Sequence, residues 1–180
     1  MPDPSDSPLP SVEVNPVMPA PVTKPPVEVT DLHKDAFFKA FLADRPYTEE
    51  FALLGGHYKV VFKTLTMAEN ADLLKQIAFD REQGRIEGAN DYYFSRVSHY
   101  RMGLALVSVN DKPFGEDLTP KSVNSDPKKG VTYVSARADA LAEWTMVKIA
   151  AVAAAMVEFD QRVITLVDAV AKPDFWKAAA

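Results

Sequence analysis

The chain has 180 residues, 47% of them hydrophobic, so it is long enough for one domain of ordinary size with a core of its own. Its formal net charge is −5 and it contains no run of five like charges, which argues against a basic face for nucleic acid. The absence of cysteine excludes disulfides, thiolate zinc sites, iron–sulfur clusters and a thiol nucleophile.

The first 30 residues form a proline-rich segment that carries nine of the 14 prolines. Neither a helix nor a central strand tolerates this spacing, so an extended arm is expected over residues 1–30. Two interpretations remain open: a passive linker, or an arm that lies along a partner by adding a strand or filling a groove. In the second interpretation the arm contacts the partner through its valines, namely Val12, Val14, Val17, Val27 and Val29.

A predicted helix over residues 31–43, capped by Thr30 or Asp31, is followed by a predicted β-hairpin over residues 51–65. The two strands, 51–54 and 58–65, are joined by Gly55 and Gly56, which can adopt the positive φ angles of a two-residue turn. Tyr58, Val60 and Phe62 share one face and are expected to face the core, because the other face carries Lys59 and Lys63.

The pair Thr66 and Glu69 has the spacing of a capping box, which predicts that a helix begins at residue 67 and continues to about residue 83. We expect its inward face to carry the apolar residues Ala71, Leu74, Ile77 and Ala78. Another helix is predicted over residues 90–107, although its apolar end, "GLALVSV", is equally compatible with a strand. A long polar loop follows over residues 110–130 and contains Phe114.

The strongest helical pattern covers residues 134–171, as one long helix or as two. Val152, Met156, Phe159, Val163, Leu166 and Val170 recur at intervals of four and three, which is the spacing of a helix–helix seam. A second row, Ile149, Ala153, Val157, Ile164 and Val167, widens this face. Pro173 ends the pattern, and Phe175 and Trp176 form an aromatic hook near the C-terminus.

Candidate catalytic patterns are weak throughout the chain. His33, His57 and His99 lie in separate predicted elements without metal-ligand spacing, and Gly55-Gly56 precedes a strand rather than a phosphate-binding helix. No nucleophile motif occurs, and the acidic pairs lie in loops. We therefore expect a protein without enzymatic activity, metal or cofactor. The apolar run 149–157 is too short to span a bilayer, so no membrane contact is expected.

Four segments carry a resemblance to a known class of proteins: an aromatic first helix, "FALLGGHYKVVFKTLTMAE", "LALVSVNDKPFGED" and "FDQRVITLVDAVAKPDFW". Over about residues 35–176 they resemble small structural or assembly proteins of tailed bacteriophages, namely baseplate-hub subunits and related tail assembly chaperones. The resemblance is one of pattern rather than of catalytic motif. It implies a structural subunit of the virion tail, made in the host cytoplasm, that binds other tail or baseplate proteins. A chaperone for tape-measure or tube protein is the alternative that it implies.

The predicted fold is mainly α within the α+β class: an arm at 1–30, a helical domain at 31–176 with one β-hairpin, a long C-terminal helix, and a short tail at 177–180. We expect a homo- or hetero-oligomer, with a small nucleic-acid-associated adaptor as the alternative from a different functional class. Besides the arm valines, the hypothetical partner interface comprises Phe114, Val152, Met156, Phe159, Val163, Phe175 and Trp176.

Overall fold

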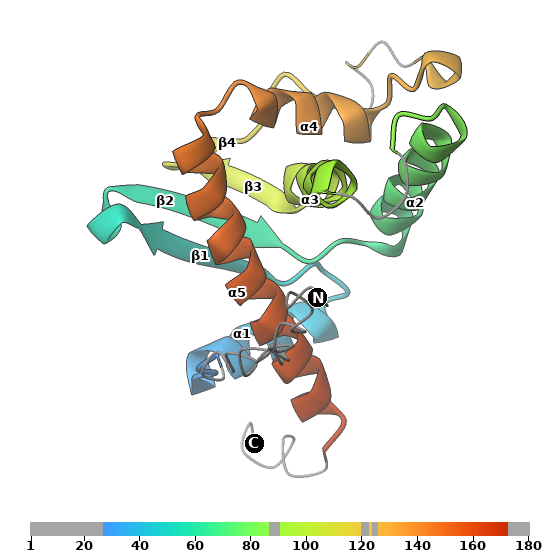
Figure 1. Cartoon of the computed structure of the whole chain (residues 1–180). Coiled ribbons are helices and arrows are strands. Elements are labelled where there is room, and N and C mark those ends of the chain that lie inside the picture. The colour runs from blue at the N-terminus through green and yellow to red at the C-terminus, as the bar shows by residue number, and fades with distance from the viewer. Residues whose placement is uncertain (1–26, 87–90, 120–122, 124–125, 173–180) are drawn as a thin grey trace, which may run out of the picture.

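The computed structural model describes residues 27–86, 91–119, 123 and 126–172, and within this part the chain has an α+β fold (Figure 1). Five helices accompany a four-stranded antiparallel sheet of order β1-β2-β3-β4. The elements follow in the order α1 (Asp31–Leu42), β1 (Thr48–Leu53), β2 (Tyr58–Lys63), α2 (Met67–Glu82), α3 (Asp91–Ala105), β3 (Leu106–Val109), β4 (Lys112–Pro113), α4 (Tyr133–Ala142) and α5 (Met146–Val170). Short 3-10 turns occupy Leu54–Gly56 and Pro127–Lys129.

Four of the helices begin directly after a threonine whose hydroxyl accepts a backbone N–H of the first turn. These caps are Thr30, Thr66, Thr132 and Thr145. The predicted capping box of Thr66 and Glu69 is confirmed, since Glu69 also accepts the Thr66 N–H at 2.9 Å. The cap of α1 is Thr30, one of the two residues predicted for it.

The predicted hairpin is confirmed, but its loop is longer than expected. Leu53 pairs with Tyr58, so four residues connect β1 to β2 instead of two. Gly55 and Gly56 do adopt positive φ angles, 67° and 90°, and Leu54 joins them at 52°. As expected, Val60 and Phe62 are fully buried.

The prediction of a single hairpin is wrong, because the sheet has two more strands. α3 ends at Ala105 and the chain continues directly into β3, which pairs antiparallel with β2. Two residues with positive φ, Asn110 and Asp111, then turn the chain into the short strand β4. Of the ambiguous run "GLALVSV", the first three residues therefore end α3 and the last four, Leu106–Val109, form a strand.

The helical pattern over residues 134–171 is divided into two helices. α4 ends at Ala142, Thr145 caps α5, and α5 crosses one face of the sheet and projects beyond it near α1 (Figure 1). The main core lies where α5 meets β1 and β2: the Phe159 ring stacks with Tyr47 at a centroid distance of 6.0 Å and packs against Phe51 and Phe62.

The buried face of α2 is not the predicted one. Ala71, Leu74 and Ala78 are exposed and Ile77 is only half-buried, whereas Leu73, Gln76 and Asp80 are buried. The helix is rotated because its two buried polar side chains bind residues of α3 and of the segment before α4. A pattern of apolar residues cannot anticipate a polar inward face.

Candidate interaction surface

The outer face of α5 carries an apolar seam along the whole helix. Its members recur at intervals of four and three: Met146, Ala150, Ala153, Val157, Asp160, Ile164, Val167 and Ala171. Ala153 and Asp160 are half-buried and the other six are exposed; Met146, Val157, Ile164 and Val167 are 80%, 46%, 62% and 53% exposed. Single exposed apolar residues are ordinary, but a continuous row at heptad spacing is the pattern of a helix that packs against another helix. We call this row the α5 seam.

The central part of the α5 seam, Ala153, Val157 and Asp160, contributes to one wall of a groove between α3 and α5. The groove has a volume of about 280 Å³. Met102, Ile149, Ala153, Met156 and Val157 supply its apolar surface, and Ser95, Ser98 and His99 line its side on α3. Ile164 and Val167 do not line it, so the seam continues past the end of the groove. We call this hollow the α3/α5 groove.

Asp160, the single charged member of the α5 seam, is held by Arg101 of α3. The Arg101 Nε donates to Asp160 Oδ2 at 3.1 Å, and Nη2 donates to Oδ1 at 2.5 Å. This bidentate pair ties the two walls of the α3/α5 groove together and compensates the carboxylate within the apolar row. Nearby, burial and the positive charge of Arg96 lower the pKa of His99, so its imidazole is neutral at pH 7.

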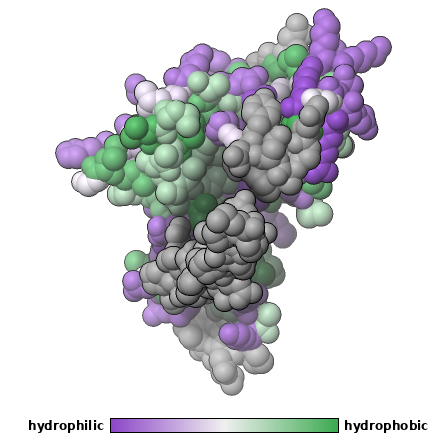
Figure 2. Space-filling view, in the orientation of Figure 1, coloured by the Kyte–Doolittle hydropathy of each residue, from purple (hydrophilic) through white to green (hydrophobic). Residues whose placement is uncertain are grey.

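A second apolar area lies where the hairpin tip meets the beginning of α5, and Figure 2 shows apolar residues gathered over this side of the molecule. A hollow of about 230 Å³ is lined by Leu54, Tyr58, Val147 and Ala151, with Lys148 beside them. Leu54 and Val147 are 67% and 77% exposed. The apolar character of the N-terminal part of α5 therefore extends around the helix to the hairpin.

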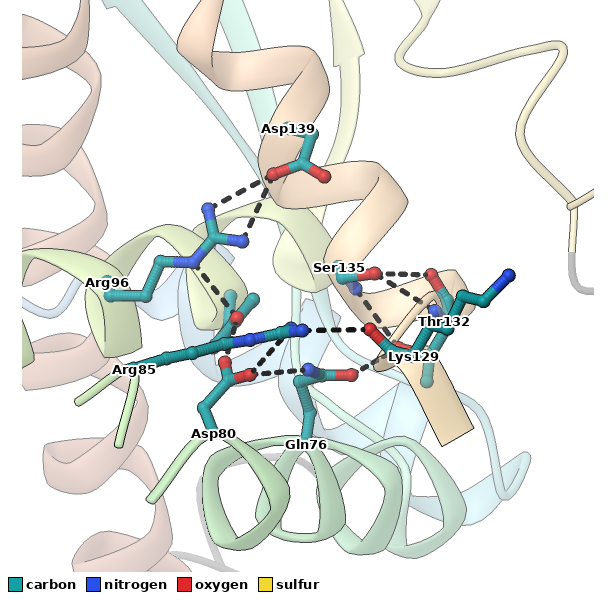
Figure 3. Close-up of polar contacts among 9 residues, drawn as sticks. Gln76, Asp80, Arg85, Arg96, Lys129, Thr132, Ser135 and Asp139 are labelled. Carbon is teal, nitrogen blue, oxygen red and sulfur yellow. Dashed lines mark hydrogen bonds and ion pairs between the residues drawn. The ribbon is translucent and has the colours of Figure 1, made fainter. Parts of the chain in front are cut away.

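The most concentrated group of polar side chains lies between α2, α3 and α4 (Figure 3). Asp80 accepts a short hydrogen bond from the Tyr100 hydroxyl and another, of 3.3 Å, from Gln76 Nε2. Arg96 donates to the Tyr100 oxygen at 2.9 Å and pairs with Asp139 of α4 at 3.1 Å. The network therefore joins α3 to α2 through Tyr100 and to α4 through Arg96.

This network is suited to holding helices together rather than to catalysis. Tyr100 and Asp80 are 1% and 2% exposed, so no substrate reaches them. Burial, together with the hydrogen bond to Asp80, raises the pKa of Tyr100 to about 12, and the phenol stays protonated at neutral pH. A permanently protonated, inaccessible hydroxyl serves as a structural hydrogen-bond donor.

Arg162 of α5 anchors the segment that precedes α1. Its guanidinium pairs closely with Glu49 of β1, and its Nε donates to the Glu28 carbonyl at 3.2 Å. The Nε2 atom of His33 lies near the same carboxylate, 3.7 Å from Glu49 Oε1. Since Arg162 and Glu49 are almost fully buried, the chain between Val27 and Thr30 is fastened to the domain at this point.

The structure corrects the proposed interface residues of α5. Val152, Met156 and Phe159 are 0%, 7% and 2% exposed and belong to the core, and Val163 packs against it, so this row is occupied by the chain's own sheet. Phe114 is also directed inward, since it contacts Trp144 edge-on and lies under the Arg137 guanidinium. The predicted row at heptad spacing therefore faces the sheet, and the exposed apolar residues of α5 belong to the other row.

The arm and hook residues are placed only in part. Val27 and Val29 are half-buried, and Val29 packs against the core. Val12, Val14, Val17, Phe175 and Trp176 lie outside the described residues.

Four residues of the predicted second row belong to the α5 seam, whereas Ile149 of that row packs against the core. The prediction lacked Met146, Ala150, Asp160 and Ala171. A search at fixed intervals of four and three from Val157 finds them all. Sequence alone does not say which of two adjacent apolar rows faces the sheet.

Within the described residues, no group of three His, Asp or Glu side chains lies close enough to hold a metal ion. In the same part of the chain, no helix is both long and apolar enough to cross a membrane. Comparisons with models of protein families, with curated proteins and with solved structures find no match.

Proposed function

We propose that this chain is a non-enzymatic assembly protein that acts through protein–protein contact, as a structural component of a bacteriophage tail or baseplate hub. The observation that carries the contact role is the α5 seam, in which six of the eight positions are both apolar and exposed. Exposed apolar surface of this regularity mainly serves association. The phage setting comes from the sequence resemblance over about residues 35–176.

The interior of the domain supports a passive rather than a catalytic role. The largest polar networks, around Asp80 and around Arg162, are buried and internally paired. Each connects elements that are distant in the sequence. The surface of the α3/α5 groove is mainly apolar, although five of its ten lining residues are polar, and such a surface suits another side chain better than a polar substrate.

The decisive experiment is mass spectrometry of purified phage particles whose genome encodes the chain, compared with lysate of the infected cells. We expect the chain in the particles at a fixed ratio to the tail proteins. Detection in the lysate only would refute the resident role and favour an assembly chaperone. A salt titration of DNA and RNA binding supplies a separate check, because affinity that falls steeply with salt would favour the nucleic-acid adaptor.

A further inference from the structure

We propose that the α5 seam binds a second copy of this chain, with the two α5 helices antiparallel, with Ile164 of each copy entering the α3/α5 groove of the other, and with Val167 packing against Ala150. This dimer rests on the proposed function, because the α5 seam is also the contact surface that the proposed function uses. The dimer is symmetric, so its interface is built from the same residues twice.

The sizes of the seam residues favour the antiparallel arrangement. Ala150 and Ala153 occupy the N-terminal half, whereas Ile164 and Val167 occupy the C-terminal half. A two-fold axis between Val157 and Asp160 places Ala153 opposite Ile164 of the second copy, and Ala150 opposite Val167. Small residues then face large ones in both halves, which is how helix interfaces reach interior packing density.

The shape of the domain favours the same arrangement. Ala153 of the α5 seam lines the groove beside α3, whereas the large residues Ile164 and Val167 lie on the part of α5 beyond the groove. Figure 1 shows the C-terminal part of α5 projecting past the sheet. An antiparallel second copy lays residues 157–164 of its α5 along the groove of the first, and the reverse contact forms simultaneously. The interface therefore closes on itself with two protomers.

Electrostatics disfavour the parallel alternative. In a parallel pair each seam residue meets its own equivalent, so Asp160 would face Asp160 of the second copy across the seam. In the antiparallel pair, Asp160 faces Val157 instead, and each carboxylate keeps its own Arg101 partner. Antiparallel helices also place opposite ends of their dipoles side by side.

The test is sedimentation velocity of the full chain over a concentration series, with two neighbouring substitutions compared. Ile164→Asp places a charge on the α5 seam, whereas Thr165→Asp places the same charge one residue away, on the exposed face off the seam. We expect wild type and Thr165→Asp to dimerise reversibly and Ile164→Asp to weaken the dimer by at least about tenfold. Circular dichroism should match in all three, since residues 164 and 165 are both exposed.

Cross-linking then tests the orientation, and the chain suits this because it contains no cysteine. Oxidation of a mixture of the A153C and I164C variants should produce a disulfide-linked heterodimer, whereas either variant alone should remain largely unlinked. Efficient linking in I164C alone would refute the antiparallel register.

A wild type that stays monomeric at every concentration would overturn the proposal and would point to a different protein, or a terminal segment of this chain, on the seam. Equal dimerisation of Ile164→Asp and Thr165→Asp would also overturn it. These failures are distinguishable from failure of the proposed function: a monomer found in phage particles refutes only the dimer, and a dimer absent from particles refutes only the phage role.

Discussion

Replacement of Arg137 should destabilise the domain more than replacement of any exposed arginine. Arg137 is 6% exposed and lies in α4. Its Nε donates to the Gly103 carbonyl and its Nη2 to the Leu106 carbonyl, each at 2.6 Å. These two carbonyls lie where α3 ends and β3 begins, so a single guanidinium fixes the helix-to-strand junction that sequence patterns leave ambiguous.

The expected loss of unfolding free energy follows from the two carbonyls that would lose their donor. Arg137→Met keeps most of the apolar stem and removes every donor, and each buried carbonyl left without a partner costs about 1–3 kcal/mol. We expect the free energy of unfolding to fall by about 3–4 kcal/mol, a large part of the 5–15 kcal/mol that is typical of a domain. Arg137→Lys should lose about half as much, because an ammonium cannot span both acceptors with the guanidinium's planar fork.

Urea denaturation followed by circular dichroism and tryptophan fluorescence measures this loss at a fixed protein concentration. Arg45→Met is the matched control, because Arg45 is exposed and its loss should change stability by less than about 0.5 kcal/mol. A loss below about 1 kcal/mol for Arg137→Met, with an unchanged m value, would refute the reasoning, since it would mean that water or another donor satisfies the two carbonyls.

Three further predictions concern helix packing, the buried network and pH. Gly103→Ala should lower the free energy of unfolding by about 1–3 kcal/mol in the same assay, because the added methyl would lie 3.1 Å from backbone atoms of α4. An unchanged stability would show that α3 and α4 can separate without cost. Tyr100→Phe should cost about 1–3 kcal/mol by leaving buried Asp80 without its hydroxyl donor, and a neutral result would contradict a structural role for that hydrogen bond. Burial and the Arg162 charge lower the pKa of His33 below its unfolded value of about 6.5. The folded state therefore disfavours the protonated imidazole, so the domain keeps its full stability above that pH and loses stability as the pH falls below it. His33→Gln should therefore flatten the fall in urea midpoint between about pH 6.5 and 5, and an identical pH profile in the variant would refute the assignment.

The features predictable from sequence are those whose partners lie close along the chain. The Thr66–Glu69 capping box involves residues three apart, and the glycines with positive φ at the hairpin tip are required by the loop itself. Strand β3 was ambiguous because a short apolar run fits a helix and a strand equally well. Its pairing with Val60 and Val61, more than 40 residues earlier, decides between them.

The burial of polar residues on α2 could not be predicted from the sequence for the same reason. Gln76 and Asp80 look like solvent-exposed positions of α2, and their burial depends on Tyr100 and Thr132, which lie in other elements. The partner-facing side of α5 was also undecidable, because two apolar rows with heptad spacing run along one helix. Only the position of the sheet shows that Phe159 faces inward and Val157 outward.

The sheet offers little surface for association, which leaves α5 as the main route. Edge strand β1 includes Glu49, which pairs with Arg162, and Glu50, which lies 3.3 Å from Lys59 on the neighbouring strand. A second β1 in antiparallel register would bring like-charged glutamates together, and charged residues on short edges are a common protection against strand addition. The opposite edge, β4, has two residues and ends at Pro113, which has no N–H to donate. With both edges unfavourable for pairing, the exposed apolar row of α5 is the surface of the described fold that the proposed assembly role would use.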